Sequence, residues 1–163
     1  MRRRVVGLAG CWLLATSLLA TGCQKNKFIP NTKLPDTELN REVIRVAEAY
    51  RRAMERRDAG AVLALAHPTY QDNSGTPQAQ DDLDFNRLKD LLKGRFKNAT
   101  RVRYRIEYQD LKFKGRSAQL DAWIDATFVY QTEDLPPRWR RYADHQRFHL
   151  IKEGDTWRFT SGL

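Results

Sequence analysis

The sequence has little cysteine. Its 163 residues contain only two cysteines, Cys11 and Cys23, and none lies after position 23. An exported fold built from the later residues has no disulfide and depends on its hydrophobic core for stability. The scarcity also excludes cysteine nucleophiles and cysteine-based metal sites from that part of the chain, and no phosphate-binding glycine loop or nucleophile-elbow motif occurs.

Long hydrophobic runs are equally scarce. The one long apolar stretch without a charged residue runs from Val5 to Gly22, directly after three arginines. A transmembrane helix needs about 20 predominantly apolar residues, and this stretch is shorter and is interrupted by glycine, serine and threonine. A basic segment followed by a short apolar one is typical of a secretory signal peptide. The sequence therefore favours a signal peptide over a membrane-spanning anchor.

Both cysteines follow small residues, and both segments resemble the lipobox of bacterial lipoproteins, in which cleavage precedes a lipidated cysteine. Residues 8–11 match that pattern more closely in isolation. However, six residues separate Cys11 from the arginines, and a signal peptide needs an apolar region of about 7–15 residues. Cys23 is therefore the predicted lipidation site, and residues 1–22 are the predicted signal peptide. The resemblance implies a periplasm-facing protein anchored in the cell envelope, and Gln24 after the cysteine favours the outer membrane.

The predicted mature chain is basic and begins with a tether. Residues 23–36 comprise the lipidated cysteine and a flexible segment with two prolines and no periodicity. Without the three signal arginines, 26 basic residues stand against 20 acidic ones, a net charge of about +6. Such a charge favours an anionic lipid or wall polymer as partner, or a solvated surface without a ligand. Nucleic acid is not an expected partner outside the cytoplasm.

Helical periodicity follows the tether. One stripe recurs at helical spacing and consists of Val43, Ala47, Tyr50 and Met54. Asp36 or Thr37 can cap this helix. A second, short helix is expected after Asp58, and a third after Asp81 or Asp82. Gly94 is its expected end.

The period then changes to two, which predicts strands. Arginines alternate with apolar residues in the first strand: Arg101, Arg103 and Arg105 against Val102, Tyr104, Ile106 and Tyr108. Residues 117–130 alternate similarly, with Leu120, Ile124 and Phe128 on one face and Asp121, Trp123 and Asp125 on the other. Residues 141–152 and 156–161 flank a hairpin turn at Gly154. The prediction is one α+β domain, residues 37–163, with three N-terminal helices packed on a curved antiparallel sheet.

Two segments resemble the nuclear transport factor 2-like superfamily, in the branch of the SnoaL-like polyketide cyclases and ketosteroid isomerases. They are "AYRRAMERRDAGAVLALAHPTYQDN", residues 49–73, and "FHLIKEGDTWRFTSG", residues 148–162. The resemblance implies a cone-shaped, cystatin-like fold over residues 36–163. In the isomerases, a tyrosine on the first helix stabilises the oxyanion and an aspartate after the second helix is the general base. The resemblance implies these roles for Tyr50 and Asp72.

A phenol and a carboxylate facing one apolar pocket can move a proton beside a carbonyl group. The other interpretations are that Tyr50 packs on the sheet and that Asp72 is a turn residue. The pocket is predicted between the helical stripe and the second strand, and its expected lining residues are Tyr50, Met54, Tyr70, Asp72, Leu120, Ile124 and Phe128.

Three functions therefore stay open. The leading one is non-catalytic binding of a small apolar or amphipathic ligand, or of an envelope protein partner. The second is a cofactor-independent lyase or isomerase that uses Tyr50 and Asp72. The third is a structural envelope module whose arginines bind anionic polymers. No cofactor is expected, and a dimer is compatible with the sequence. A metal is not expected either, because His145 and His149 lie about 13 Å apart along a strand.

Overall fold

The computed structural model describes residues 27–73, 82–132 and 135–163, so the predicted signal peptide and Cys23 lie outside the described residues. The described residues form three helices: α1 (Glu38–Arg56), α2 (Ala59–Leu65) and α3 (Phe85–Lys97). The main antiparallel sheet has the order β3 (Ala99–Lys114), β4 (Ser117–Tyr130), β5 (Arg138–Glu153) and β6 (Thr156–Ser161). A second pair joins β1 (Gln71–Asp72) to β2 (Leu83–Asp84).

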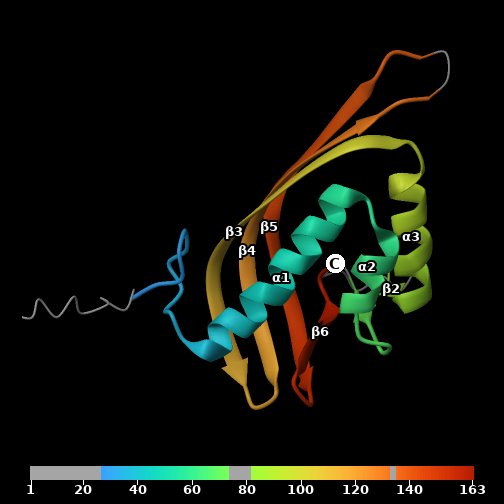
Figure 1. Cartoon of the computed structure of the whole chain (residues 1–163). Helices are drawn as coiled ribbons and strands as arrows, with labels where there is room; N and C mark the ends of the chain where they lie inside the picture. Colours follow the sequence, from blue (N-terminus) through green and yellow to red (C-terminus); the bar gives the residue numbers. More distant parts are fainter. Residues whose placement is uncertain (1–26, 74–81, 133–134) are drawn as a thin grey trace, which may run out of the picture.

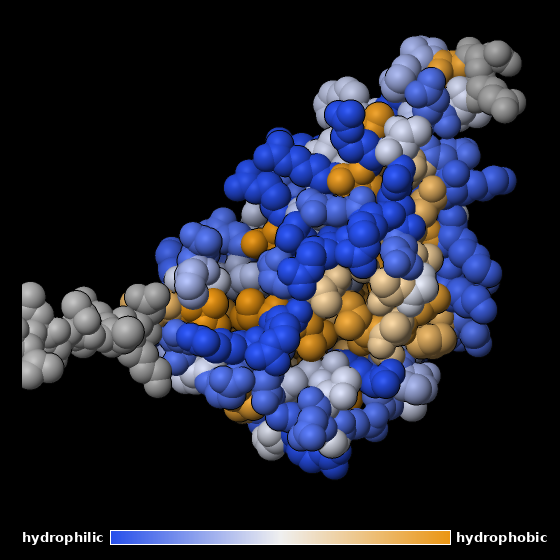
Figure 2. All heavy atoms as spheres, in the orientation of Figure 1, coloured by the Kyte–Doolittle hydropathy of each residue, from blue (hydrophilic) through white to orange (hydrophobic). Residues whose placement is uncertain are grey.

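The helices cover one face of the curved sheet, and its other face is open (Figure 1). We call these the inner and the outer face. The predicted α+β class is therefore confirmed. The stripe on α1 is buried and packs against the inner face, where the Tyr50 ring lies 5.5 Å from that of Tyr104 and 5.8 Å from those of Phe148 and Phe159. On the helical side, Figure 2 shows hydrophobic side chains gathered where α1, α2 and β6 meet.

Capping side chains determine where the helices begin. Thr37 accepts a hydrogen bond from the Asn40 backbone N–H (3.1 Å), and Asp58 accepts one from Ala61 (2.9 Å). Helix α3 differs from the prediction at both ends, because its cap is Asp84, which accepts from the Arg87 N–H, and because it continues through Gly94 to Lys97. A glycine in an exposed helix costs only about 1 kcal/mol relative to alanine, which the surrounding helix tolerates.

The segment before α1 is folded, which corrects the prediction that residues 23–36 form a flexible tether up to the domain. Phe28 forms an antiparallel bridge with Pro35, and the Ile29 N–H donates to the Leu34 carbonyl at 3.0 Å. Leu34 is 4% exposed and belongs to the core. The folded unit therefore includes the turn from Phe28 to Pro35 before Thr37, because one leucine of a nonperiodic segment is buried against the core.

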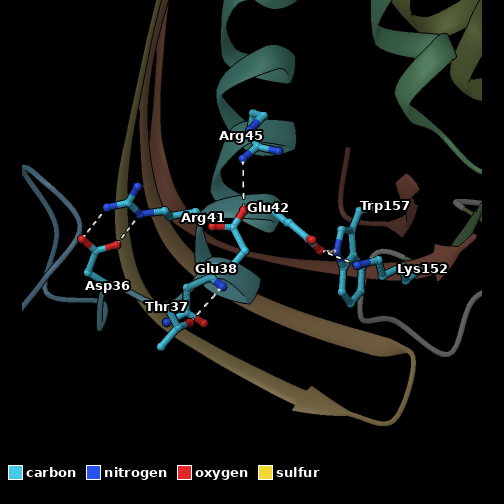
Figure 3. A network of polar contacts seen from close by, with 9 residues as sticks. Asp36, Thr37, Glu38, Arg41, Glu42, Arg45, Lys152 and Trp157 are labelled. Atoms are coloured by element: carbon cyan, nitrogen blue, oxygen red, sulfur yellow. Dashed lines mark hydrogen bonds and ion pairs between the residues drawn. The ribbon is translucent and has the colours of Figure 1, made fainter. Parts of the chain in front are cut away.

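Polar contacts join the first turns of α1 to the preceding turn on one side and to the sheet on the other (Figure 3). Arg41 forms an ion pair with Asp36, which joins the helix to the preceding turn. On the other side, the Glu42 carboxylate accepts hydrogen bonds from Lys152 (2.6 Å) and from the indole N–H of Trp157 (2.9 Å). These contacts tie α1 to the β5–β6 hairpin. Among the described helices, none has the length and hydrophobicity needed to cross a bilayer.

Candidate functional site

A cavity of about 360 Å³ opens between the helices and the inner face of the sheet. Its aromatic wall comes from α1, β3 and β4 and consists of Tyr50, Tyr104, Phe128 and Tyr130, with Ala126 among them. Its polar wall comes from α3 and β5 and consists of Arg95, Arg140, Arg141, Tyr142 and Gln146. Gly162 and Leu163, just after β6, complete the lining. The cavity thus combines apolar rings with cationic groups.

Two buried phenols face each other in this cavity. The hydroxyl oxygens of Tyr50 and Tyr104 lie 3.0 Å apart, and the two residues are only 3% and 7% exposed. Burial raises the pKa of Tyr50 above its ordinary value and that of Tyr104 well above it. Both groups are therefore neutral phenols at physiological pH. One hydroxyl hydrogen serves the bond between them, and the other has no acceptor among the described residues, so it can be donated to an oxygen of a ligand.

The cavity is positively charged. The Arg95 guanidinium lies 5.9 Å from the Phe128 ring centroid, and neither Arg95 nor Arg140 forms an ion pair with a described residue. Arg141 differs, because its side chain lies on the outer face of the sheet, where it forms two hydrogen bonds with Asp125 (2.9 and 3.2 Å). No aspartate or glutamate side chain of the described residues lines the cavity. Two guanidinium groups that have no ion pair with a described residue thus remain for a negatively charged or strongly polar ligand group.

Asp72 lies on an adjoining recess of about 720 Å³ rather than on this cavity. One of its oxygens, Oδ2, accepts hydrogen bonds from the Gly162 N–H (2.7 Å) and from the Tyr70 hydroxyl (3.3 Å). The Tyr70 oxygen in turn accepts from the Leu163 N–H (2.8 Å). Burial raises the pKa of the Tyr70 hydroxyl, so it remains protonated. Asp72 and Tyr70 together therefore hold the segment that separates the two spaces.

Gly162 is essential to that segment. Its φ of +96° is a conformation that residues with a side chain rarely adopt, and a Cβ atom there would lie 2.3 Å from the Arg147 carbonyl oxygen. The Gln146 amide also donates to the Gly162 carbonyl at 2.9 Å. Both backbone groups of Gly162 are thus held by side chains, and the wall they form has a defined position.

The predicted pocket residues lie in three different places. Tyr50 and Phe128 line the cavity, whereas Asp72 lines the adjoining recess. Tyr70 is buried behind the wall, and the fully buried residues, which do not line the cavity, are Met54, Leu120 and Ile124. The space expected next to these three side chains is filled by core packing. The catalytic roles of Tyr50 and Asp72 stay a prediction.

Tyr104 and Arg95 are among the cavity residues that sequence reasoning missed. The alternation of β3 placed Tyr104 on the inner face, and only its position opposite Tyr50 makes it part of the cavity. Arg95 lies in the last turn of α3, where a basic residue is also favoured by the helix dipole. Its sequence position therefore carries no signal of a role in the cavity.

The polar residues of β4 lie on the outer face, as their alternation with buried residues indicates. Asp121 pairs with Arg147 and Asp125 pairs with Arg141, and neither aspartate lines the cavity. His145 lies on β5 as predicted, where its ring contacts Trp123 and its Nδ1 atom lies 3.2 Å from the Gln109 side-chain oxygen.

The fold matches solved structures at low sequence identity. A ketosteroid isomerase-like protein from Erwinia carotovora atroseptica is 18% identical, with a TM-score of 0.58 over 77% of this chain and 93% of that one. A proposed scytalone dehydratase from Novosphingobium aromaticivorans is 14% identical, with a TM-score of 0.64 over 76% of this chain and 80% of that one. A proposed dehydratase of the nuclear transport factor 2-like family from Streptomyces avermitilis is 13% identical, with a TM-score of 0.58 over 75% and 91%.

These similarities establish that the chain has the nuclear transport factor 2-like fold, as the sequence resemblance implied. No family model matches the sequence, and no curated protein matches it. Because one fold hosts many activities, the function has to be argued from the site itself.

Proposed function

We propose that this chain is a lipid-anchored protein of the cell envelope whose cavity binds a small amphipathic ligand without catalysing a reaction. The ligand has an aromatic or other apolar body and carries a carbonyl or anionic oxygen. The observation that carries this proposal is the buried Tyr50–Tyr104 pair, with one hydroxyl hydrogen left for a ligand oxygen, in a cavity that Arg95 also lines. The surrounding rings supply apolar contact for the body of the ligand.

The distribution of acidic groups supports a binding role. A proton abstraction needs a base within hydrogen-bonding reach of the bound substrate. The described side chains that line the cavity include no carboxylate, and Asp72 on the adjoining recess already accepts hydrogen bonds from Gly162 and Tyr70. In this arrangement Asp72 serves to position the cavity wall.

The second candidate is the cofactor-independent lyase or isomerase that uses Tyr50 and Asp72. One observation favours it: the cavity and the recess of Asp72 share the lining residues Arg95, Tyr142, Gln146 and Leu163. A ligand spanning both spaces would contact the phenol and the carboxylate together. Turnover of an enolisable ketone that Asp72→Asn abolishes in a folded protein would establish this function instead.

The binding proposal is tested with anilinonaphthalene sulfonate, an aromatic anion whose fluorescence reports its binding. Tyr104→Phe should weaken its affinity about three- to tenfold, because one hydrogen bond contributes on the order of 1 kcal/mol. Arg95→Gln should weaken it by about tenfold or more, because a charged partner is lost. Arg45→Gln, an exposed substitution on the far side of α1, is the charge-matched control and should change nothing. Equal affinities for all four proteins would overturn the assignment of this cavity.

The anchor is tested separately. Cys23→Ala should abolish acyl labelling and membrane attachment, because the proposed acceptor thiol is lost. Cys11→Ala should leave both unchanged, since residues 1–22 are removed as signal peptide. Fractionation of the envelope then tests the outer-membrane location. If Cys11→Ala abolishes the labelling instead, the proposed start of the mature chain is wrong.

A further inference from the structure

One end of the outer sheet face concentrates positive charge. Cross-strand partners lie on the same face, and three neighbouring rows run Arg101–Val129–Trp139, Arg103–Thr127–Arg141 and Arg105–Asp125–Ala143. We call these nine positions the basic end. It holds four arginines against one aspartate, and the next row begins with Glu107. The single aspartate is bound to Arg141, and the three arginines of β3 form no ion pair with any described residue.

The basic end also carries an exposed aromatic ring. Trp139 is 71% exposed, in the row that begins with Arg101. An exposed tryptophan close to arginines suits a membrane interface, where the indole lies among the headgroups and the guanidinium groups meet phosphates.

The N-terminal segment emerges next to this surface. Asn31, in the folded turn before α1, lines a surface recess together with Arg105 and Trp123. In Figure 1 this turn lies beside β3. Four residues separate Phe28, at the start of this turn, from Cys23. They can span at most about 18 Å, so a lipid on Cys23 would hold the basic end close to the bilayer.

We propose that the basic end docks on the anionic phospholipid headgroups of the membrane in which the chain is anchored. The orientation rests on the proposed lipidation of Cys23, whereas the affinity of the basic end for anionic lipid does not. Docking through the outer face turns the helical layer away from the bilayer. The cavity opens on the inner side of the sheet, so it stays accessible while the protein is docked.

The affinity is tested without the lipid anchor, with residues 23–163 carrying Cys23→Ser. Every core residue among those that the structure describes lies between Ile29 and Leu163, so this chain retains all of them. Sedimentation with vesicles should show binding to phosphatidylcholine mixed with phosphatidylglycerol, no binding to phosphatidylcholine alone, and a loss of binding as salt is added. Combined Arg101→Gln, Arg103→Gln and Arg105→Gln should lower the partition coefficient by about tenfold to a hundredfold.

The control removes the same charge from the other side of the molecule. Lys89→Gln, Lys93→Gln and Lys97→Gln change three exposed positions of α3, and should leave the partition coefficient within about twofold of that of the parent chain, since those lysines face away from the docked bilayer. Binding should also shift the tryptophan emission to shorter wavelength, and Trp139→Phe should remove most of that shift. Equal losses for both triple variants, an unchanged shift, or equal binding to neutral vesicles would each overturn the docking proposal.

Different results would refute the lipid anchor on Cys23 and the docking of the basic end. Vesicle binding by the Cys23→Ser chain without any acyl labelling of Cys23 in the cell would leave the docking surface intact and refute the anchor. Labelling of Cys23 without vesicle binding would support the anchor and refute the docking surface. Tighter binding to a soluble polyanion such as dextran sulfate than to anionic vesicles would refute a bilayer as the occupant.

Discussion

At the scale of single residues, Asp72 shows how a side chain can resemble a catalytic group and serve the structure. It lies where the isomerase resemblance implies a base, yet its carboxylate accepts hydrogen bonds from the Gly162 N–H and from Tyr70. Gly162 can occupy its position only because it lacks a Cβ atom. The position of the cavity wall thus depends on the two residues together.

Asp72→Ala should lower the free energy of unfolding by about 1–3 kcal/mol, because the Gly162 N–H loses its acceptor. Asp72→Asn should cost less, since the amide oxygen can still accept that hydrogen bond. Urea unfolding of the three proteins measures both differences. If Asp72→Ala is as stable as the parent protein, the carboxylate does not hold the wall and the structural role is refuted.

At the scale of elements, α1 is joined to the β5–β6 hairpin by the Glu42 carboxylate. The hydrogen bonds from Lys152 and, next, from Trp157 lower the pKa of Glu42 below its ordinary value. A carboxylate whose pKa is lower in the folded state contributes stability above its unfolded pKa, and that contribution is lost as the pH falls through the folded value. The contact therefore stabilises the helix–hairpin junction at neutral pH and not in strong acid.

Glu42→Gln should accordingly lower the melting temperature at pH 7. The difference from the parent protein should shrink below the ordinary glutamate pKa of about 4.3 and vanish once the folded pKa is passed. Thermal unfolding followed across this pH range makes the measurement. Glu38→Gln, at an exposed position of the same helix, is the matched control and should change the melting temperature at pH 7 much less than Glu42→Gln does. A Glu42→Gln difference that stays constant with pH would contradict this account.

At the scale of the whole molecule, the folded unit is larger than its periodic segments. The turn from Phe28 to Pro35 has no helical or strand period, and it joins the fold because Leu34 is buried in the core. This turn lies between the predicted lipidation site and α1, and its residue Asn31 lies next to Arg105 of the basic end. The position of one leucine thus affects how close an anchored domain would stand to a membrane.

Leu34→Ala should destabilise the domain by about 2–4 kcal/mol, the usual cost of truncating a buried leucine. Phe28→Ala lies in the same turn at a residue that is 43% exposed, and should cost less than about 1 kcal/mol. Chemical denaturation of both variants tests where the fold begins. Equal, small effects would mean that the turn contributes little and that the domain starts at α1.

The sequence alone predicted the elements whose signal is local. The stripe from Val43 to Met54 predicted α1, because a helical period can be recognised within a short stretch of sequence. The alternation around Val102 and Ile124 predicted β3 and β4 with their inner and outer faces, and Gly154 marked the turn between β5 and β6, where it has a positive φ. The layered α+β class follows from these elements, since each has one apolar face to bury.

Tertiary structure decided the candidate site. Tyr50 and Tyr104 are 54 positions apart in the sequence, and Asp72 and Gly162 are 90 positions apart. A local sequence pattern cannot predict contacts between residues so far apart. Met54 and Ile124 have the same apolar character as the residues that line the cavity, and only side-chain packing separates the filled core from the open space beside Phe128. A period in sequence reports which face of an element is buried, whereas the shape left between elements depends on how all of their side chains fit together.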